Sequence, residues 1–201
     1  DGDIDNAAQK EKFIRQAQAN VLRLVQLLND VDTITNLEIS KDPILKHSFI
    51  IQDLINEVAQ NLSVKGLKKN IQFHFKKGSE SPTTVFADKN KIYQVLVNIF
   101  SNAAKYGKID GQIIASVYKL EDGKVLIEIS DNGIGISKVD LEKVFQPFFR
   151  SKALNHPDIK GIGVGLSIVQ RLCLLLNIGI NISSSEQLGT KVELFFPQSP
   201  K

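Results

Sequence analysis

The stretch Val95-Leu-Val-Asn-Ile-Phe-Ser-Asn-Ala-Ala-Lys-Tyr-Gly-Lys108 decides how the rest of the chain is interpreted. Its apolar residues recur at helical spacing: Leu96, Ile99, Phe100 and Ala103. Asn98, Asn102 and Lys105 stand at i, i+4 and i+7 and form a second, polar stripe on the same helix. An Asn carbonyl oxygen can coordinate a hard cation, and a Lys suits phosphate. From this segment alone, a solvated polar stripe on a surface helix explains the pattern equally well.

The composition is that of a soluble globular protein. The 201 residues are 42% hydrophobic and 23% charged, which suits one ordinary domain with an appendage. The net charge of +3 is too small to favour nucleic acid as a partner. No apolar run approaches the roughly 20 residues that span a bilayer, and we expect no signal peptide. We expect a cytoplasmic domain that is a fragment of a longer protein, and a membrane anchor in the full-length protein stays open.

Cysteine and histidine give no sign of a metal centre or a disulfide framework. The single Cys173 lies in an apolar run, which excludes a disulfide within the chain and weakly favours a reducing compartment. The histidines His47, His74 and His156 are far apart and lack metal-ligand spacing.

Residues 5–37 contain no Pro or Gly and carry a heptad pattern. Its apolar positions follow steps of three and four: Ile14, Ala17, Val21, Leu24, Leu28, Val31 and Thr35. So narrow a stripe favours a coiled-coil-like helix that pairs with a helix from another copy or a missing segment. A helix lying on its own domain core is the alternative. Asp42-Pro43 ends the helix, so we expect domains at 1–41 and 42–201.

The residues after Pro43 mix helical and strand patterns. A helix that includes Phe49 and Ile50 is predicted to end near Gly66, and another is predicted to begin after an N-cap at Asp88. Alternating patterns predict strands at 71–75, 84–86, 112–120, 124–130, 178–182 and 192–196. Residues 137–160 are predicted to be irregular. The fold class is therefore α+β with a mostly antiparallel sheet.

Two glycine-rich segments flank that irregular region. Asp131-Asn-Gly-Ile-Gly-Ile follows a predicted strand, and Gly161-Ile-Gly-Val-Gly-Leu precedes a predicted helix that ends near Leu176. Glycines let a ligand approach the backbone, and a helix start offers free N–H groups to an anion. Either segment alone is also explained as an ordinary turn.

Taken in order, these segments resemble the catalytic ATP-binding domain of the sensor histidine kinases, in the superfamily of Hsp90, DNA gyrase B and MutL. The segments are similar to that family's N box at 88–106, G1 box at 131–136, F box at 145–150, G2 box at 161–166 and final Gly189-Thr190 turn. The resemblance covers about residues 49–197. It implies a Bergerat-type fold, a two-layer α/β sandwich whose mixed, mostly antiparallel sheet is covered on one face by helices.

The resemblance implies a site for ATP and Mg2+. Asn98 would coordinate Mg2+, while Asn102 and Lys105 would contact the phosphates. Residues 137–160 would form a lid, whose closure brings Arg150 to the terminal phosphate. Asn98, Lys105 and Arg150 are thus the implied catalytic residues.

The same resemblance implies an adenine site around Asp131. This carboxylate would accept a hydrogen bond from the adenine amino group, and Gly133 and Gly135 would let the base come close. Further residues implied to surround the nucleotide are Tyr106, Ile136, Phe145, Gly161, Gly163, Gly165, Leu166 and Thr190.

Asn98 separates a kinase from the hydrolytic relatives, which carry a Glu there to activate water. An amide cannot take up a proton, so hydrolysis by that route is disfavoured. His47, His74 and His156 do not match the family's phosphoacceptor context. We therefore expect an ATP-dependent protein-histidine kinase fragment, whose acceptor histidine lies on a dimerisation helix outside this chain. The implied partners are that helix and a response regulator, in a homodimeric full-length protein that does not bind nucleic acid.

Two other functions stay open. One is a non-catalytic, ATP-dependent interaction module, similar to a pseudokinase or an anti-sigma factor. The other is a structural protein that dimerises through the heptad helix, which the three nucleotide-binding segments disfavour.

Overall fold

The structure is a computed structural model that describes residues 43–64, 70–151 and 162–199, together with residues 10, 11, 13–18, 21 and 25. The chain divides into two compact units, Asp1–Lys41 and Asp42–Lys201. In the first unit the described residues are helical, and Arg15 forms an ion pair with Glu11, one turn earlier, at 2.6 Å. Ile14 and Val21 of the predicted heptad stripe are exposed. Its positions Leu24, Leu28, Val31 and Thr35 lie outside the described residues.

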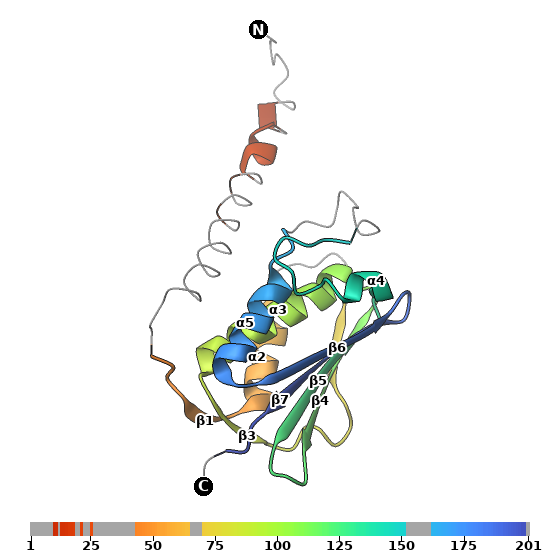
Figure 1. Ribbon diagram of the computed structural model, residues 1–201. Coiled ribbons are helices and arrows are strands. Elements are labelled where there is room, and N and C mark those ends of the chain that lie inside the picture. The colour runs from red at the N-terminus through yellow and green to blue at the C-terminus, as the bar shows by residue number, and fades with distance from the viewer. Residues whose placement is uncertain are drawn as a thin grey trace. The chain divides into compact units, whose positions relative to one another are not determined.

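The second unit contains helices and strands in mixed order (Figure 1). They are β1 His47–Ile50, α2 Ile51–Val64, β2 Gln72–Phe75, β3 Thr84–Ala87, α3 Lys89–Tyr106, β4 Gln112–Lys119, β5 Val125–Asp131, α4 Lys138–Leu141, α5 Gly165–Leu176, β6 Gly179–Ser185 and β7 Gly189–Phe196. Five strands form one sheet in the order β2-β4-β5-β7-β6, and β1 pairs with β3 in a small second sheet.

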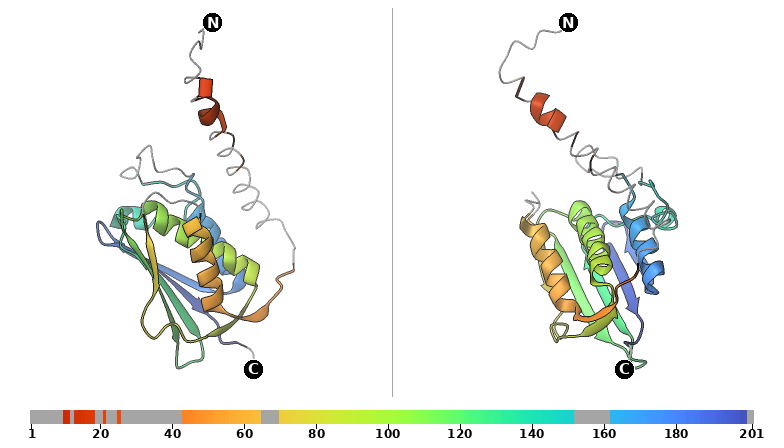
Figure 2. Two further views of the ribbon diagram at one scale, coloured as in Figure 1. Left: turned by 180° about the vertical axis from the view of Figure 1, so that it is seen from behind. Right: turned by 90° about the vertical axis from the view of Figure 1, so that its left-hand side faces the viewer.

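The five-stranded sheet is mixed and mostly antiparallel. Only β2 and β4 run parallel among its described strands, and every other neighbouring pair is antiparallel. Helices α2, α3 and α5 lie side by side on one face of the sheet (Figure 2). The predicted α+β sandwich with one helix-covered face is therefore confirmed.

Helix α3 occupies the middle of that helical layer. Asp88 caps it, because one carboxylate oxygen accepts hydrogen bonds from the N–H groups of Asn90 and Lys91, each at 3.1 Å. Its buried residues repeat at helical spacing, as predicted: Ile92, Val95, Leu96, Ile99, Phe100 and Ala103. Packing this stripe on the sheet leaves the stripe of Asn98, Asn102 and Lys105 at the border of the core, where all three are half-buried.

Strand β1 corrects one prediction. Phe49 and Ile50 were assigned to a helix, but they pair antiparallel with Val85 and Thr84 of β3. The helix begins only at Ile51, whose N–H donates to the carbonyl of Thr83 at 3.0 Å. Pairing with a strand more than 30 positions away in the chain overrides the local helical pattern.

The lid segment contains a second correction. Residues 137–160 were predicted to be irregular, but Lys138–Leu141 form the short helix α4. Ser137 caps that helix by accepting a hydrogen bond from the N–H of Asp140 at 3.2 Å. The rest of the lid is described only as far as Ser151.

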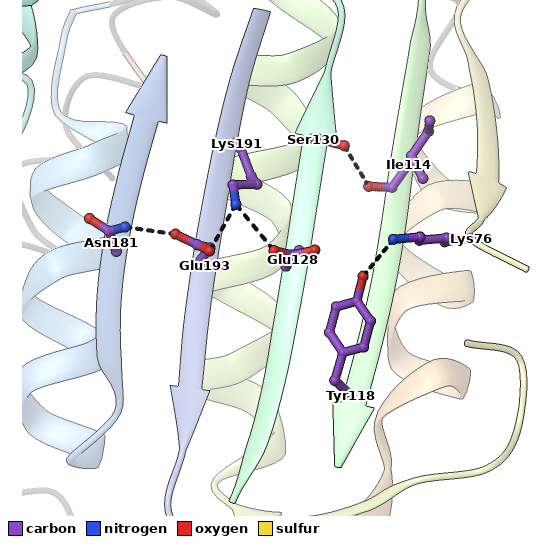
Figure 3. Close-up of polar contacts among 8 residues, drawn as sticks. All are labelled: Lys76, Ile114, Tyr118, Glu128, Ser130, Asn181, Lys191 and Glu193. Atoms are coloured by element: carbon purple, nitrogen blue, oxygen red, sulfur yellow. Dashed lines mark hydrogen bonds and ion pairs between the residues drawn. The ribbon is translucent and has the colours of Figure 1, made fainter. Parts of the chain in front are cut away.

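The sheet face opposite the helices carries a polar ladder (Figure 3). Lys191 donates to Glu128 at 3.2 Å and to Glu193 at 2.9 Å, and Asn181 donates to Glu193 at 2.6 Å. Glu128 alternates along β5 with the buried Ile127 and Ile129, which face the helices. The ladder therefore crosses three strands on the face that the helices do not cover.

Candidate functional site

Two carboxamides of α3 face the first residue of α5. Asn98 donates from Nδ2 to the carbonyl of Gln94, one turn earlier, at 2.9 Å, which fixes the amide plane. A Cβ atom on Gly165 would lie 3.1 Å from Asn98 Oδ1 and 3.6 Å from Asn102 Nδ2. Glycine at position 165 thus allows α5 to begin directly beside both amides. The predicted N box and G2 box meet at this point.

The start of α5 leaves its first N–H groups uncapped. Within the described part of the chain, no side chain caps this end, because the N-cap residue is the buried Val164. The Ser167 hydroxyl donates to the Val164 carbonyl at 2.8 Å, so it does not serve the N–H groups. Free N–H groups and the positive end of the helix dipole favour an anion.

Gly163 lies just before α5 and packs against the backbone of the F box. It has a φ of +81°, and a Cβ atom there would overlap the carbonyl oxygen of Phe149. A side chain at position 163 is therefore excluded on both conformational and steric grounds. The contact brings the chain around Phe149 against the beginning of α5.

Cationic side chains lie around the end of α3. Lys105 Nζ stands 5.6 Å from the centroid of the Tyr106 ring, within cation–π range. Burial raises the pKa of the Tyr106 hydroxyl, and the positive charge of Arg150 offsets part of this rise. The charge of Arg150 in the lid therefore acts on the end of α3.

Asp131 ends β5 as a half-buried carboxylate. Its Oδ1 accepts the N–H of Gly133 at 2.8 Å and the N–H of Thr190 at 3.3 Å. Burial raises the pKa of Asp131 above its ordinary value, and these two hydrogen bonds offset part of that rise. Backbone groups from two different turns thus hold one carboxylate in place.

Gly133 and Gly135 are required by the protein's own backbone. A Cβ atom on Gly133 would lie 2.6 Å from the Tyr106 carbonyl oxygen and 2.7 Å from Asp131 Oδ1. Gly135 has a φ of +69°, and a Cβ atom there would overlap the Ser185 carbonyl. The predicted reason for both glycines was the approach of a base. The structure shows a different reason, which is the close approach of α3 and of the end of β6. The approach of a base stays a prediction.

Ser184 is a member of the site that the sequence interpretation missed. Its hydroxyl accepts the N–H of Ile136 at 2.9 Å, donates to the Gly189 carbonyl at 2.8 Å, and lies 2.9 Å from the Thr190 hydroxyl oxygen. The alternation of β6 places Ser184 on the same face as Ile180 and Ile182. A polar residue at an inward position of a strand was the available signal.

The remaining predicted residues are placed as follows. Phe145 in the lid and Leu166 in the first turn of α5 are half-buried, whereas Gly161 lies outside the described residues. His47 and His74 are exposed on strands, with contacts to the Leu45 carbonyl and to Gln72. His156 lies outside the described residues.

The described residues contain no group of three or more His, Cys, Asp or Glu side chains that could hold a metal ion. No helix in the described ranges has the length and apolar character needed to cross a membrane.

Residues 87–200 match the family of histidine kinase-, DNA gyrase B- and HSP90-like ATPases. This match spans more than half of the chain, so the chain belongs to that family. The sensor protein RprX of Bacteroides fragilis (strain YCH46) is 34% identical over 146 residues, which cover 72% of this chain and 28% of RprX. The chain therefore corresponds to less than a third of this relative.

Solved structures of histidine kinases share the fold. The catalytic domain of ThkA is 29% identical, with a TM-score of 0.65 over 78% of this chain and 99% of that domain. ThkA in complex with the response regulator TrrA gives a TM-score of 0.72 at 24% identity, over 98% of this chain and 54% of that one. Full-length ShkA in complex with AMPPNP gives a TM-score of 0.79 at 23% identity, and the match covers 96% of this chain and 39% of ShkA. At these two lower identities the likeness concerns the fold alone.

Proposed function

We propose that this chain contains the ATP-binding catalytic domain of a sensor histidine kinase, which transfers the γ-phosphoryl group of ATP to a histidine on a separate helix. The observation that carries the proposal is the meeting of Asn98, Asn102 and Gly165 at the uncapped start of α5. Amide oxygens beside free N–H groups suit a cation bound to phosphate. Asp131 supplies the second half of a nucleotide site.

Asp131 is suited to the amino group of adenine. Its Oδ1 already accepts two backbone N–H groups, and the carboxylate has further acceptor capacity on Oδ2. Adenine offers an amino group to such an acceptor, whereas guanine offers a carbonyl oxygen at the same position. A site built on one hydrogen bond discriminates strongly against a base that lacks the donor.

The phosphate end fits Mg2+ with one protein ligand. The Nδ2 bond of Asn98 to Gln94 turns the amide so that Oδ1 is beside the start of α5, where the phosphates would lie. A cation that takes most of its ligands from phosphate and water needs few protein oxygens, which agrees with the absence of a carboxylate cluster among the described residues. When bound, Mg2+ would neutralise negative charge on the phosphates.

The residues of this chain position and stabilise rather than react covalently. In the proposed transfer, an imidazole nitrogen forms a bond to the γ-phosphorus while the bond to the bridging oxygen breaks and ADP leaves. Lys105 and Arg150 would balance the negative charge spread over the transferred group. Asn98 carries an amide and cannot act as the base that activates water. The acceptor would come from a helix outside this chain.

The proposed partners follow from the same assignment. Residues 1–41 would be a partial dimerisation segment in which residues 9–38 resemble the second helix of the family's helical hairpin. Residues 42–201 would be the catalytic domain, in a homodimeric full-length protein. ThkA is seen with a response regulator, which supports a response regulator as the final phosphoryl acceptor here. The domain itself would be cytoplasmic.

Calorimetry with ADP and GDP, each with Mg2+, tests the binding site. We expect ADP to bind much more tightly than GDP, and its affinity to fall when Mg2+ is removed. Equal affinities for the two nucleotides would refute the role of Asp131. No dependence on Mg2+ would refute the role of Asn98.

A transfer assay separates the kinase from a non-catalytic binding module. The chain is incubated with γ-labelled ATP and a separate helix carrying a candidate acceptor histidine. Label on that helix that is stable in base and labile in acid supports the kinase. Binding of ATP without transfer to any histidine-bearing helix of the full-length protein favours the module.

A further inference from the structure

A single hydroxyl, that of Ser184, joins three pieces of the base-binding end. The pieces are the G1 segment at Ile136, the carbonyl of Gly189 and the hydroxyl of Thr190. Ser184 is half-buried and lies near the end of β6, whereas Ile136 is 48 positions earlier in the chain. The serine therefore links segments that no local pattern connects.

The proton positions in this network are determined by the partners. A serine hydroxyl has one donor hydrogen and two acceptor sites. The Gly189 carbonyl can only accept, so it takes the hydrogen of Ser184, and the Ile136 N–H can only donate. The remaining contact must then be a hydrogen bond that the Thr190 hydroxyl donates to Ser184. All three capacities of Ser184 are used.

This arrangement acts on Asp131 through Thr190. The side chain and the neighbouring carbonyl of the Gly189–Thr190 turn are both held by Ser184, and the N–H of Thr190 binds Asp131 Oδ1. Because Thr190 donates its hydrogen to Ser184, its oxygen can act only as an acceptor toward any further partner. The Thr190 hydroxyl oxygen is then a hydrogen-bond acceptor, as the Asp131 carboxylate is, and both suit a ligand that donates a hydrogen bond.

We propose that Ser184 is a positioning residue for base recognition. It fixes the Gly189–Thr190 turn so that Asp131 is held in the orientation that accepts the amino group of the base. This inference deepens the proposed function and rests on it. Removing the hydroxyl leaves Ile136 N–H, the Gly189 carbonyl and the Thr190 hydroxyl without their partner, which releases the turn from Asp131.

The experiment compares ADP with purine riboside 5′-diphosphate, which lacks only the amino group. We expect Ser184→Ala to lower ADP affinity about tenfold and the affinity of the analogue less than about twofold, so that discrimination is lost. Ser184→Thr keeps the hydroxyl and should restore discrimination. Ser183→Ala is the matched control, because Ser183 is exposed on the other face of the same strand, and it should change neither affinity.

The outcomes separate the two proposals. If Ser184→Ala weakens the binding of ADP and of the analogue equally, the serine only supports the fold. If neither affinity changes, Ser184 has no role in binding. Either result overturns the inference. If Ser184→Ala does not fold, Thr190→Val removes the hydroxyl beside Ser184 while keeping the backbone N–H, and retained discrimination there would also overturn it. A parent protein that does not bind ADP would instead refute the proposed function.

Discussion

The two ends of the candidate site are built differently. At the base end, backbone N–H groups hold Asp131, and Gly133 and Gly135 lie against backbone carbonyls. At the phosphate end, the groups are side chains of α3 facing the start of α5, with a lid described only up to Ser151. The base end is thus fixed by the sheet, whereas the phosphate end depends on side chains and on how helices and lid approach each other.

This difference indicates that one end determines base selection and the other the rate of transfer. A carboxylate held by two backbone donors has one orientation, which suits selection of a base. A long cationic side chain such as that of Lys105 can adjust to a transferring phosphoryl group, which suits catalysis. Substitutions at the base end should therefore change affinity and folding, and those at the phosphate end should change the rate of transfer.

The largest expected effect is on transfer. Asn98→Ala should reduce the rate of phosphoryl transfer more than about a hundredfold, because the cation loses its protein oxygen and the phosphates lose alignment. The fold should persist, since Asn98 is half-buried outside the apolar stripe of α3. The measurement is single-turnover labelling of an acceptor helix, with thermal melting as the control. Labelling at the parental rate would contradict the role of Asn98.

The second effect is on base affinity. Asp131→Asn should weaken ADP binding between about tenfold and a hundredfold, because a charged acceptor becomes neutral. The amide oxygen can still accept the N–H groups of Gly133 and Thr190, so the fold should remain. Calorimetry measures the change. If ADP binds the variant as tightly as the parent, the base-reading role is wrong.

Two glycines give a matched pair, one at each end. Gly135→Ala should lower stability by about 1–3 kcal/mol, because φ is +69° and the new Cβ overlaps the Ser185 carbonyl. In Gly165→Ala the nearest atom to the new Cβ is the side-chain oxygen of Asn98, at 3.1 Å, and the Asn102 amide lies at ordinary contact distance. This substitution should lower stability by less than about 1 kcal/mol while reducing the transfer rate. Denaturant unfolding of both variants tests this, and a similar loss of stability in both would remove the contrast between the ends.

The pH dependence of stability should differ between the parent and Asp131→Asn. Burial raises the pKa of Asp131 in the folded protein, so the folded state binds more protons than the unfolded state between the ordinary and the raised pKa. The contribution of Asp131 to stability is therefore present below its ordinary pKa and is lost as pH rises through the raised value.

In the absence of nucleotide, the parent should consequently be less stable at neutral pH than Asp131→Asn by a margin that shrinks toward about pH 4. Melting temperatures of both proteins across this range measure the margin. A margin that grows as the pH falls would mean that the folded-state pKa is lowered.

The smallest effect should come from the polar ladder of Lys191, Glu128, Glu193 and Asn181, on the sheet face opposite the helices. Glu128→Gln removes one carboxylate beside Lys191, which keeps Glu193 at 2.9 Å. Partly exposed ion pairs contribute little, so stability should change by less than about 1 kcal/mol. ADP binding should be unchanged. A loss of ADP binding would show that residues on the sheet face opposite the helices affect the site.

The sequence was sufficient to predict those elements whose pattern is local. The structure confirms the apolar stripe of α3, the strands β4 and β5, and the Asp88 cap. Each of these features depends on residues within one element or one turn. Strand β1 was missed because its formation depends on β3, which a periodicity argument cannot detect.

The site shows the same limit. Asn98 and Asn102 were predicted because they share a helical face, whereas Ser184 was missed because its partners come from two other segments, one at Ile136 and one at Gly189–Thr190. The steric need for Gly133 and Gly135 was also invisible, because it arises from Tyr106 and Ser185 across the fold. Register between distant strands, rather than composition, decides these contacts.

The hydrogen bond from Thr190 to Asp131 has a consequence for biosynthesis. It joins residues 59 positions apart, and β7 must pair with β5 before it can form. Helix α3 and the β4–β5 hairpin can assemble from earlier parts of the chain, but loop closure over such a distance delays the last pairing. A growing chain on the ribosome would thus complete α3 with its two amides well before the Asp131 carboxylate is held in place. Under the proposed function, gain of adenine selectivity should therefore report the final docking of the β6–β7 hairpin during folding.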